Sequence, residues 1–252
     1  MVSYRALTAG TVVCIKTATP GSPHLRREAL MLSRLASPHV PRLLADGVDS
    51  GFIVEEYIAG NLLAALARPA LIAALPQIMT GLTAATDAFT AAHPPLIHRD
   101  IKLANLCLAG DRLVVFDFGS AEFEGHRAPD SRRCRRMKLG RGTHHAQPLE
   151  QLLGLHTQDR RVDIFAAAGV IYWILTGRPP YLNIYPDEDT SRVQYTAAEE
   201  RLEDDIVGWP AAVREQLWHA LRASPEQRSC SLKPLAEAIL TCRNMDSCSK
   251  SR

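Results

Sequence analysis

Four polar residues in one short stretch have side chains suited to a metal-assisted reaction. Asp100 and Lys102 lie two positions apart, Asn105 follows three positions later, and Asp117 comes after a short apolar segment. Asparagine and aspartate offer hard oxygen ligands, which suit Mg²⁺. The stretch is therefore a candidate metal site, with an aspartate and a lysine on the loop that leads into it.

The residues between Asn105 and Asp117 have the pattern of a β-hairpin. Two apolar runs, Leu106–Leu108 and Leu113–Phe116, flank the turn-forming sequence Ala109–Arg112. Such a pattern predicts two short strands joined by a tight turn. The hairpin carries Asn105 at one end and Asp117 at the other, so we expect these two side chains to come close in space.

The whole stretch resembles a known catalytic signature. Residues 98–105 read H-R-D-I-K-L-A-N, and residues 117–119 read D-F-G. This resembles the catalytic loop and metal-binding turn of eukaryotic-type protein kinases, H-R-D-x-K-x-x-N and D-F-G, and every fixed position matches. Five specified residues and an intact D-F-G at hairpin distance make a chance match improbable.

Residues near the N-terminus match the strand and helix that hold the nucleotide phosphates in that family. Short strands are predicted at Val2–Leu7 and Thr11–Thr17, and the second resembles the kinase strand V-A-I-K with Lys16 as its lysine. An apolar stripe predicts a helix over His24–Ala36. Glu28 on this helix matches the glutamate that pairs with the strand lysine.

The next part of the chain resembles the hinge between the two kinase lobes. Strands are predicted at Val40–Ala45 and Phe52–Val54, and the segment Glu55–Gly60 then matches the hinge. The resemblance implies that adenine is bound by the backbone groups of Glu56, Tyr57 and Ile58. Glu55 departs from the family, which generally has an apolar or small residue there. Because a buried carboxylate is costly when unpaired, we expect Glu55 to have a polar partner or the local backbone to be shifted.

The second half of the chain is predicted to be mostly helical. Helices are expected in Asn61–Ala67, Ala70–Ala92, Ala211–Arg222 and Ser231–Thr241, from their apolar periodicity. Another helix, very apolar, is predicted to begin at Asp163, whose negative charge is favourable at a helix N-terminus. Asp163 also resembles the aspartate that begins the central helix of the large kinase lobe.

The segment between the metal-binding turn and Gln147 is strongly basic. Gly142–Thr143 and Pro148–Glu150 resemble the end of a kinase activation segment, although the proline lies one position early. Phosphate on Ser131, or an acidic partner, is predicted to order this loop through bonds to arginine. Its seven cationic residues are Arg127, Arg132, Arg133, Arg135, Arg136, Lys138 and Arg141.

A second family position lies near the C-terminus. The sequence Pro225–Arg228 resembles the kinase P-x-x-R. In the family this arginine meets the glutamate at the end of the activation segment, so we expect an ion pair between Arg228 and Glu150.

Composition places the chain among ordinary globular proteins. It has 252 residues, 46% hydrophobic and 22% charged, and a net charge of +2, which gives no reason to expect nucleic acid as a partner. Its six cysteines form no disulfide or zinc pattern, which favours reduced thiols. No signal sequence is visible, and the apolar run Ile164–Leu175 is shorter than the ~20 residues of a spanning helix. A cytoplasmic protein with no membrane segment is therefore expected.

The resemblance runs from about Val2 to Thr241 and implies an α+β fold of two lobes. Residues 1–58 would form a small, mostly β but incomplete N-lobe, residues 59–242 a larger, mostly α C-lobe, and residues 243–252 a polar tail. The Gly-rich loop with which kinases begin does not precede Lys16. We favour a start of the chain further upstream as the explanation, and a degenerate nucleotide site is the alternative.

The resemblance further implies ATP and Mg²⁺ as cofactors and a protein with Ser or Thr as the substrate, with an upstream activating kinase as a further partner. Asp100 would act as base, Lys102 would offset charge on the transferred phosphoryl group, and Asn105 and Asp117 would hold Mg²⁺. Lys16, steadied by Glu28, would hold the other two phosphates. Lys102 together with Thr143 favours Ser/Thr over Tyr specificity. Two alternatives stay open. One is an inactive, regulatory protein of kinase fold, and the other is a small-molecule kinase, although a lysine at the position of Lys102 is not typical of that group.

Overall fold

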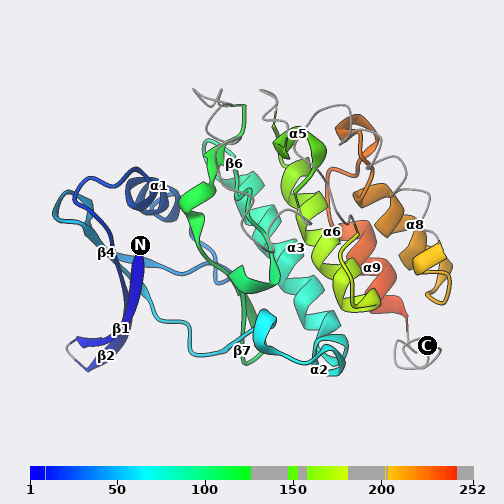
Figure 1. Ribbon diagram of the computed structural model, residues 1–252, viewed down its shortest axis with the longest axis horizontal. Coiled ribbons are helices and arrows are strands. Elements are labelled where there is room, and N and C mark those ends of the chain that lie inside the picture. Colours follow the sequence, from blue (N-terminus) through cyan, green and yellow to red (C-terminus); the bar gives the residue numbers. More distant parts are fainter. Residues whose placement is uncertain (9, 126–146, 153–157, 181–201, 203, 243–252) are drawn as a thin grey trace.

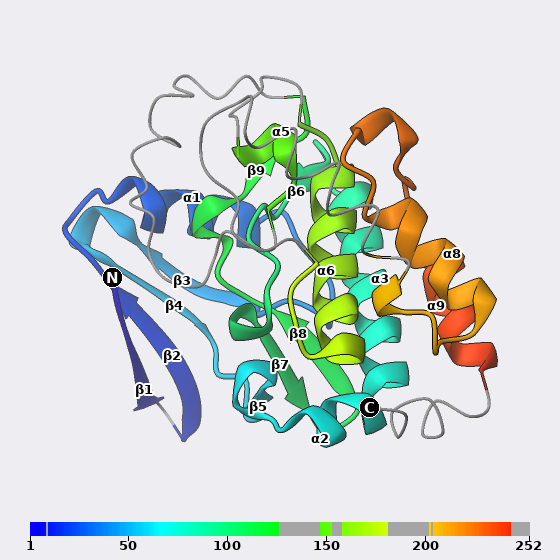
Figure 2. The same cartoon turned by 45° about the vertical axis from the view of Figure 1, so that its right-hand side comes forward.

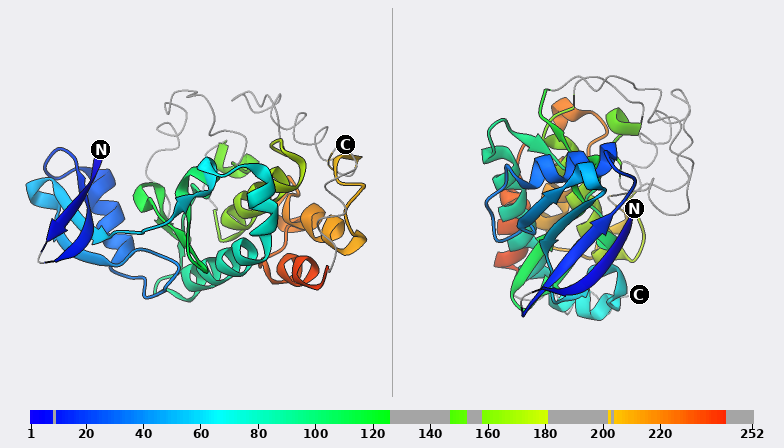
Figure 3. Two further views of the ribbon diagram at one scale, coloured as in Figure 1. Left: turned by 90° about the horizontal axis from the view of Figure 1, so that it is seen from below. Right: turned by 90° about the vertical axis from the view of Figure 1, so that its left-hand side faces the viewer.

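The computed structural model describes residues 1–8, 10–125, 147–152, 158–180, 202 and 204–242. A β-sheet with one helix occupies one end of the molecule, and a bundle of helices occupies the other (Figure 1). The view from below shows the same arrangement, with the sheet well separated from the last helices (Figure 3). The predictions made for the basic segment, Ser131, Thr143 and the tail 243–252 fall outside the described residues.

Four antiparallel strands form the sheet at the N-terminal end. They lie in the order β1-β2-β4-β3, so β2 is central beside β4 and β1 is at the edge. The first two strands confirm the prediction, whereas β3 begins later and β4 runs further than predicted. The bounds are β1 Val2–Thr8, β2 Thr11–Thr17, β3 Leu43–Gly47 and β4 Phe52–Glu56.

One helix, α1 (Pro23–Leu32), packs against this sheet. Proline is well suited to the first turn of a helix, since its missing N–H has no partner there. Leu25 and Ala29 on its inner face join Val48 and Ile53 in a small apolar core. The helix ends at Leu32, so the prediction of a helix to Ala36 was wrong at its C-terminal end.

Two small sheets link the N-terminal part to the helices. In the first, β5 (Asn61–Leu62) pairs with β7 (Leu106–Ala109), which pairs with β8 (Arg112–Val115). The predicted hairpin is therefore confirmed. The predicted helix over Asn61–Ala67 was wrong, because Asn61 and Leu62 form ladder pairs with Leu108 and Cys107. In the second sheet, β6 (Leu96–Ile97) pairs with β9 (Glu122–Phe123).

The remaining long elements of the described chain are helices (Figure 2). The main apolar core lies among them, and α6 is buried along nearly its whole length. No helix in the described ranges is long and apolar enough to cross a membrane. The bounds are α2 Arg68–Ala73, α3 Leu75–Ala91, α5 Leu149–Leu152, α6 Arg161–Thr176, α8 Ala211–Ala220 and α9 Lys233–Thr241.

Candidate active site

The loop between β6 and β7 brings two polar side chains to one carboxylate oxygen of Asp100. Lys102 Nζ lies 2.9 Å from Asp100 Oδ2, and Asn105 Nδ2 donates to the same oxygen at 3.0 Å. Asn105 Nδ2 also donates to the Asp100 carbonyl at 2.9 Å. Both side-chain contacts are made to Oδ2, so they hold the Asp100 carboxylate through that oxygen and do not involve Oδ1.

A buried aspartate on α6 holds the backbone of this loop. Asp163 Oδ2 accepts the His98 N–H at 2.7 Å, and Oδ1 accepts the Arg99 N–H at 2.8 Å. Burial raises the pKa of Asp163, and the two N–H groups work against that shift. The helix begins at Arg161, so Asp163 lies in its first turn and does not cap it. Its role in the structure is to anchor the loop, which the sequence did not predict.

His98 joins the loop to the end of the hairpin. Its Nδ1 accepts the Asp100 N–H at 3.2 Å, so the neutral ring carries its proton on Nε2, which donates to the Phe116 carbonyl at 3.1 Å. The ring is fully buried and packs edge-on against Phe118, with centroids 4.6 Å apart. His98 therefore sets the position of Asp100 relative to the turn at Asp117.

The turn at Asp117 adjoins the catalytic loop as predicted. The Phe116 N–H donates to the Asn105 carbonyl at 3.1 Å, which closes the hairpin at the end that carries both residues. Asp117 and Arg99 both have a φ of 68°, a conformation that is rare for residues other than glycine. Strained backbone of this kind concentrates at functional sites, where the surrounding contacts hold it in place.

Asn105 and Asp117 together fit a magnesium ion. Because Asn105 Nδ2 donates to Asp100, the Asn105 oxygen Oδ1 is the atom that could serve as a ligand, together with the carboxylate of Asp117. Across the described residues, no group of three or more His, Cys, Asp and Glu could hold a metal alone. Mg²⁺ is usually bound by one or two protein ligands together with substrate phosphates, so a site of Asn105 and Asp117 would not require such a group.

The predicted pair of Lys16 and Glu28 is present, and a third residue joins it. Lys16 Nζ on β2 lies 2.5 Å from Glu28 Oε1 on α1 and 2.9 Å from Glu55 Oε1 on β4. All three side chains are buried. Glu28 Oε1 also accepts the Phe118 N–H at 3.2 Å, which ties Lys16 to the turn at Asp117. The expectation that Glu55 has a polar partner is confirmed, and that partner is Lys16.

Burial and the nearby charge of Glu55 raise the pKa of Glu28 to about 7, against the opposing effect of Lys16. Glu28 thus binds a proton more tightly in the folded than in the unfolded chain, where its pKa is near 4.5. Its contribution to stability is full below pH 4.5 and is lost as the pH rises to 7. We predict that the free energy of unfolding of the wild type, measured with urea, falls by about 3 kcal/mol over this window. In Glu28→Gln, which lacks the titrating carboxyl, this fall should be absent. A variant that loses stability with the same pH profile as the wild type would contradict this prediction.

The hinge residues lie at the end of β4 and beyond it. The Glu56 N–H donates to the Arg42 carbonyl at 2.9 Å, so it is not available to a base. The Glu56 side chain pairs with Arg42 and Arg112. Tyr57 and Ile58 lie in the segment that leads to β5, and the Tyr57 ring packs 5.0 Å from the Arg5 guanidinium.

A carboxylate that the sequence analysis did not single out contacts both α1 and the catalytic loop. Glu122 Oε1 on β9 lies 3.2 Å from Arg27 Nη2 and 3.8 Å from Arg99 Nη1. Arg99 directly precedes Asp100, so this contact links Glu122 to the loop that carries Asp100. The proximity of β9 to β6 brings Glu122 there, a long-range pairing that spacing alone does not reveal.

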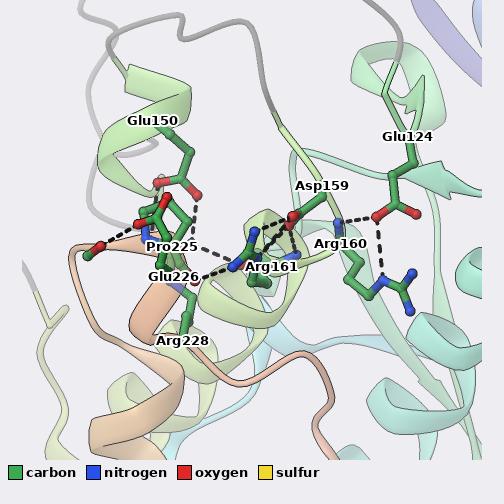
Figure 4. A network of polar contacts seen from close by, with 9 residues as sticks. Glu124, Glu150, Asp159, Arg160, Arg161, Pro225, Glu226 and Arg228 are labelled. Atoms are coloured by element: carbon green, nitrogen blue, oxygen red, sulfur yellow. Dashed lines mark hydrogen bonds and ion pairs between the residues drawn. The ribbon is translucent and has the colours of Figure 1, made fainter.

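The predicted ion pair between Glu150 and Arg228 is also present (Figure 4). Arg228 Nη1 lies 2.6 Å from Glu150 Oε1, Nη2 lies 3.2 Å from Oε2, and both side chains are buried. The guanidinium also packs 4.7 Å from the Phe165 ring. All five N–H donors of Arg228 are satisfied, since the remaining bonds go to the carbonyls of Arg161, Arg222 and Ala223.

We predict that breaking this buried pair destabilises the fold strongly. Arg228→Met should lower the free energy of unfolding by about 3–5 kcal/mol, because it leaves the buried Glu150 carboxylate unpaired. The control is Asp49→Asn, which breaks the exposed pair of Asp49 with Arg26 and should cost at most about 1 kcal/mol. Equal losses in the two variants, measured by urea unfolding, would refute the prediction.

Asp100 and Lys102 on a strained loop, the neighbouring turn at Asp117 and the buried pair of Lys16 and Glu28 are arranged as the resemblance to protein kinases implies. The protein kinase domain family matches residues 5–246. The chain therefore belongs to the protein kinase family, and its α+β fold confirms the predicted class.

Several curated proteins are similar to this chain. The serine/threonine-protein kinase PknF of Mycobacterium tuberculosis is 29% identical over 170 residues, which cover 64% of this chain and 35% of PknF. The probable serine/threonine-protein kinase PknB of Bifidobacterium longum is 31% identical over 173 residues, covering 62% and 24%. The U-box domain-containing protein 34 of Arabidopsis thaliana is 26% identical over 230 residues, covering 85% and 28%. The chain thus matches between a quarter and about a third of the length of these relatives.

Proposed function

We propose that this chain transfers the γ-phosphate of ATP to Ser or Thr of a protein substrate. The observation that carries the proposal is the Asp100 carboxylate, held through Oδ2 by Lys102 and Asn105 beside the turn at Asp117. Phosphoryl transfer requires positioning and neutralisation of charge more than covalent chemistry, and these groups supply both. Ser/Thr specificity is supported by Lys102 and by the kinases PknF and PknB, to which the chain is similar.

Asp100 is the candidate base. Because Oδ2 accepts hydrogen bonds from Lys102 and Asn105, the substrate hydroxyl would meet Oδ1. As the oxygen of this hydroxyl attacks the γ-phosphorus, the proton passes to Asp100 and the bond to the leaving ADP oxygen breaks. Lys102 lies beside the same carboxylate and would offset charge on the transferred group.

The nucleotide would lie between the sheet and the hairpin. Lys16, held by Glu28, is the cation that would bind the α- and β-phosphates. The carbonyl of Glu56 and the backbone groups of Tyr57 and Ile58 would bind adenine, because the Glu56 N–H already donates to Arg42. Asn105 and Asp117 are the residues that would hold Mg²⁺, which when bound neutralises the charge of the phosphates.

A second candidate is a binding module of kinase fold that transfers no phosphate. The observation that favours it is the contact of Glu55 with Lys16. The family generally has an apolar or small residue at position 55, so this second carboxylate alters the surroundings of the lysine that would hold the phosphates. This module would still fold as described and could still bind nucleotide, so binding alone does not separate the two candidates.

The test is a transfer assay with phosphoamino-acid analysis. The chain is incubated with γ-labelled ATP, Mg²⁺ and a generic basic protein, and nucleotide binding is measured in parallel. Label on Ser or Thr of the substrate supports the proposal. Nucleotide binding without label favours the binding module, and label on Tyr would show that the assigned substrate class is wrong.

A further inference from the structure

Lys16 is shared between two buried carboxylates that come from different elements. Glu28 reaches it from α1 and Glu55 from β4, at 2.5 and 2.9 Å. Glu55 is 4% exposed and Lys16 is 5% exposed. When all three groups are ionised, the cluster carries one positive and two negative charges.

The sheet register places Glu55 at this position. Cys14 is paired with Glu55 and Lys16 with Ile53, so Glu55 lies diagonally opposite Lys16 on the same face of the sheet. Side chains in this relation are within reach of one another when they are long. Glu55 therefore contacts Lys16 independently of α1.

The two carboxylates differ in the support that they receive. Glu28 Oε1 accepts hydrogen bonds from both Lys16 and the Phe118 N–H. Glu55 Oε1 forms an ion pair with Lys16. The second oxygen of each carboxylate, Oε2, is buried without a hydrogen-bond partner among the described residues. Buried carboxylates with an unpartnered oxygen are costly, so an uncharged residue at position 55 would cost less in stability alone.

We propose that Glu55 is a positioning residue that holds Lys16 from the sheet and lowers the affinity of the site for nucleotide polyphosphates. The inference rests on the proposed function, because it takes Lys16 as the cation that receives the phosphates. A lysine ammonium has three N–H donors. Two are directed at Glu28 and Glu55, which leaves one for a phosphate oxygen.

The charge of Glu55 opposes the phosphates in two ways. It repels them directly, and it neutralises part of the Lys16 charge that would attract them. Both effects act at short range in a buried site, where water screens them little. Both also grow with the number of phosphates on the ligand, so a nucleoside without phosphate should be insensitive to Glu55.

The experiment measures the affinity of adenosine, Mg·ADP and Mg·ATP by calorimetric titration. The variants are Glu55→Gln and Glu55→Met, which both remove the charge at similar side-chain volume. The control is Asp49→Asn, which removes an exposed carboxylate elsewhere in the N-terminal part. We expect both Glu55 variants to bind Mg·ATP about tenfold more tightly than the wild type, with a smaller gain for Mg·ADP. Adenosine should change by less than about twofold, and Asp49→Asn should match the wild type throughout.

The outcomes separate this inference from the proposed function. Circular dichroism establishes that each variant is folded, and Glu55→Met carries the test if Glu55→Gln is not. Unchanged or weaker Mg·ATP binding in the folded Glu55 variants overturns the inference and leaves the proposed function standing. An equal gain for adenosine also overturns it, because Glu55 would then act on the base. Absence of nucleotide binding in all forms, wild type included, overturns the proposed function and the inference with it.

Discussion

Replacing Asp117 with alanine is expected to abolish phosphoryl transfer, with a loss of at least about 10³-fold in rate. The bond between the Phe116 N–H and the Asn105 carbonyl closes the hairpin at the end that carries Asn105 and Asp117, the proposed metal ligands. Without the carboxylate, Mg²⁺ loses its main anionic ligand and the phosphates lose the charge that neutralises them.

The matched control for this prediction lies on the same hairpin. Asp111 is exposed in the turn at the far end of β7 and β8 and contacts Gln77, 3.2 Å away. Asp111→Ala should therefore keep nearly the wild-type rate in a labelled-ATP assay. If Asp117→Ala kept more than about a tenth of the activity, or Asp111→Ala lost as much, the metal assignment would be wrong.

Replacing Asp100 with asparagine is expected to slow transfer by about 10²–10⁴-fold while leaving ATP affinity near normal. Asparagine keeps the shape of the side chain and can still accept hydrogen bonds from Lys102 and Asn105. An amide cannot take the proton of the substrate hydroxyl. The effect should therefore appear in kcat and not in the dissociation constant of ATP.

Asp87→Asn is the control for Asp100→Asn, because it makes the same chemical change on the surface of α3. Asp87 pairs with Lys233 at 3.1 Å, and its side chain is 47% exposed. It should leave both kcat and ATP affinity unchanged. A fall in ATP affinity as large as the fall in kcat for Asp100→Asn would show that Asp100 acts in binding.

Features that follow from a local pattern or from a family motif were predicted well from the sequence. The hairpin from Leu106 to Phe116 follows from two apolar runs and a turn, and it brings Asn105 beside Asp117. The pairs of Lys16 with Glu28 and of Glu150 with Arg228 came from family motifs, which fix residue types at positions far apart in the chain.

Features decided by long-range pairing were missed. Asn61 and Leu62 form a strand because β7 lies beside them, and their own helical pattern does not outweigh that pairing. The helix α1 stops at Leu32, and Leu35 packs against the core from the following turn, so its place in the apolar stripe was misleading. Glu55 was recognised as unusual, but its partner depends on the register between β2 and β4, which no local pattern specifies.

The most direct test of the account is single-turnover transfer from γ-labelled ATP to a basic protein substrate. The wild type and Asp100→Asn are compared side by side with saturating ATP and Mg²⁺. The account predicts label on Ser or Thr of the substrate with the wild type, and transfer slower by about 10²-fold or more with the variant. Equal rates for the two forms, or no transfer by a wild type that binds ATP, would contradict it.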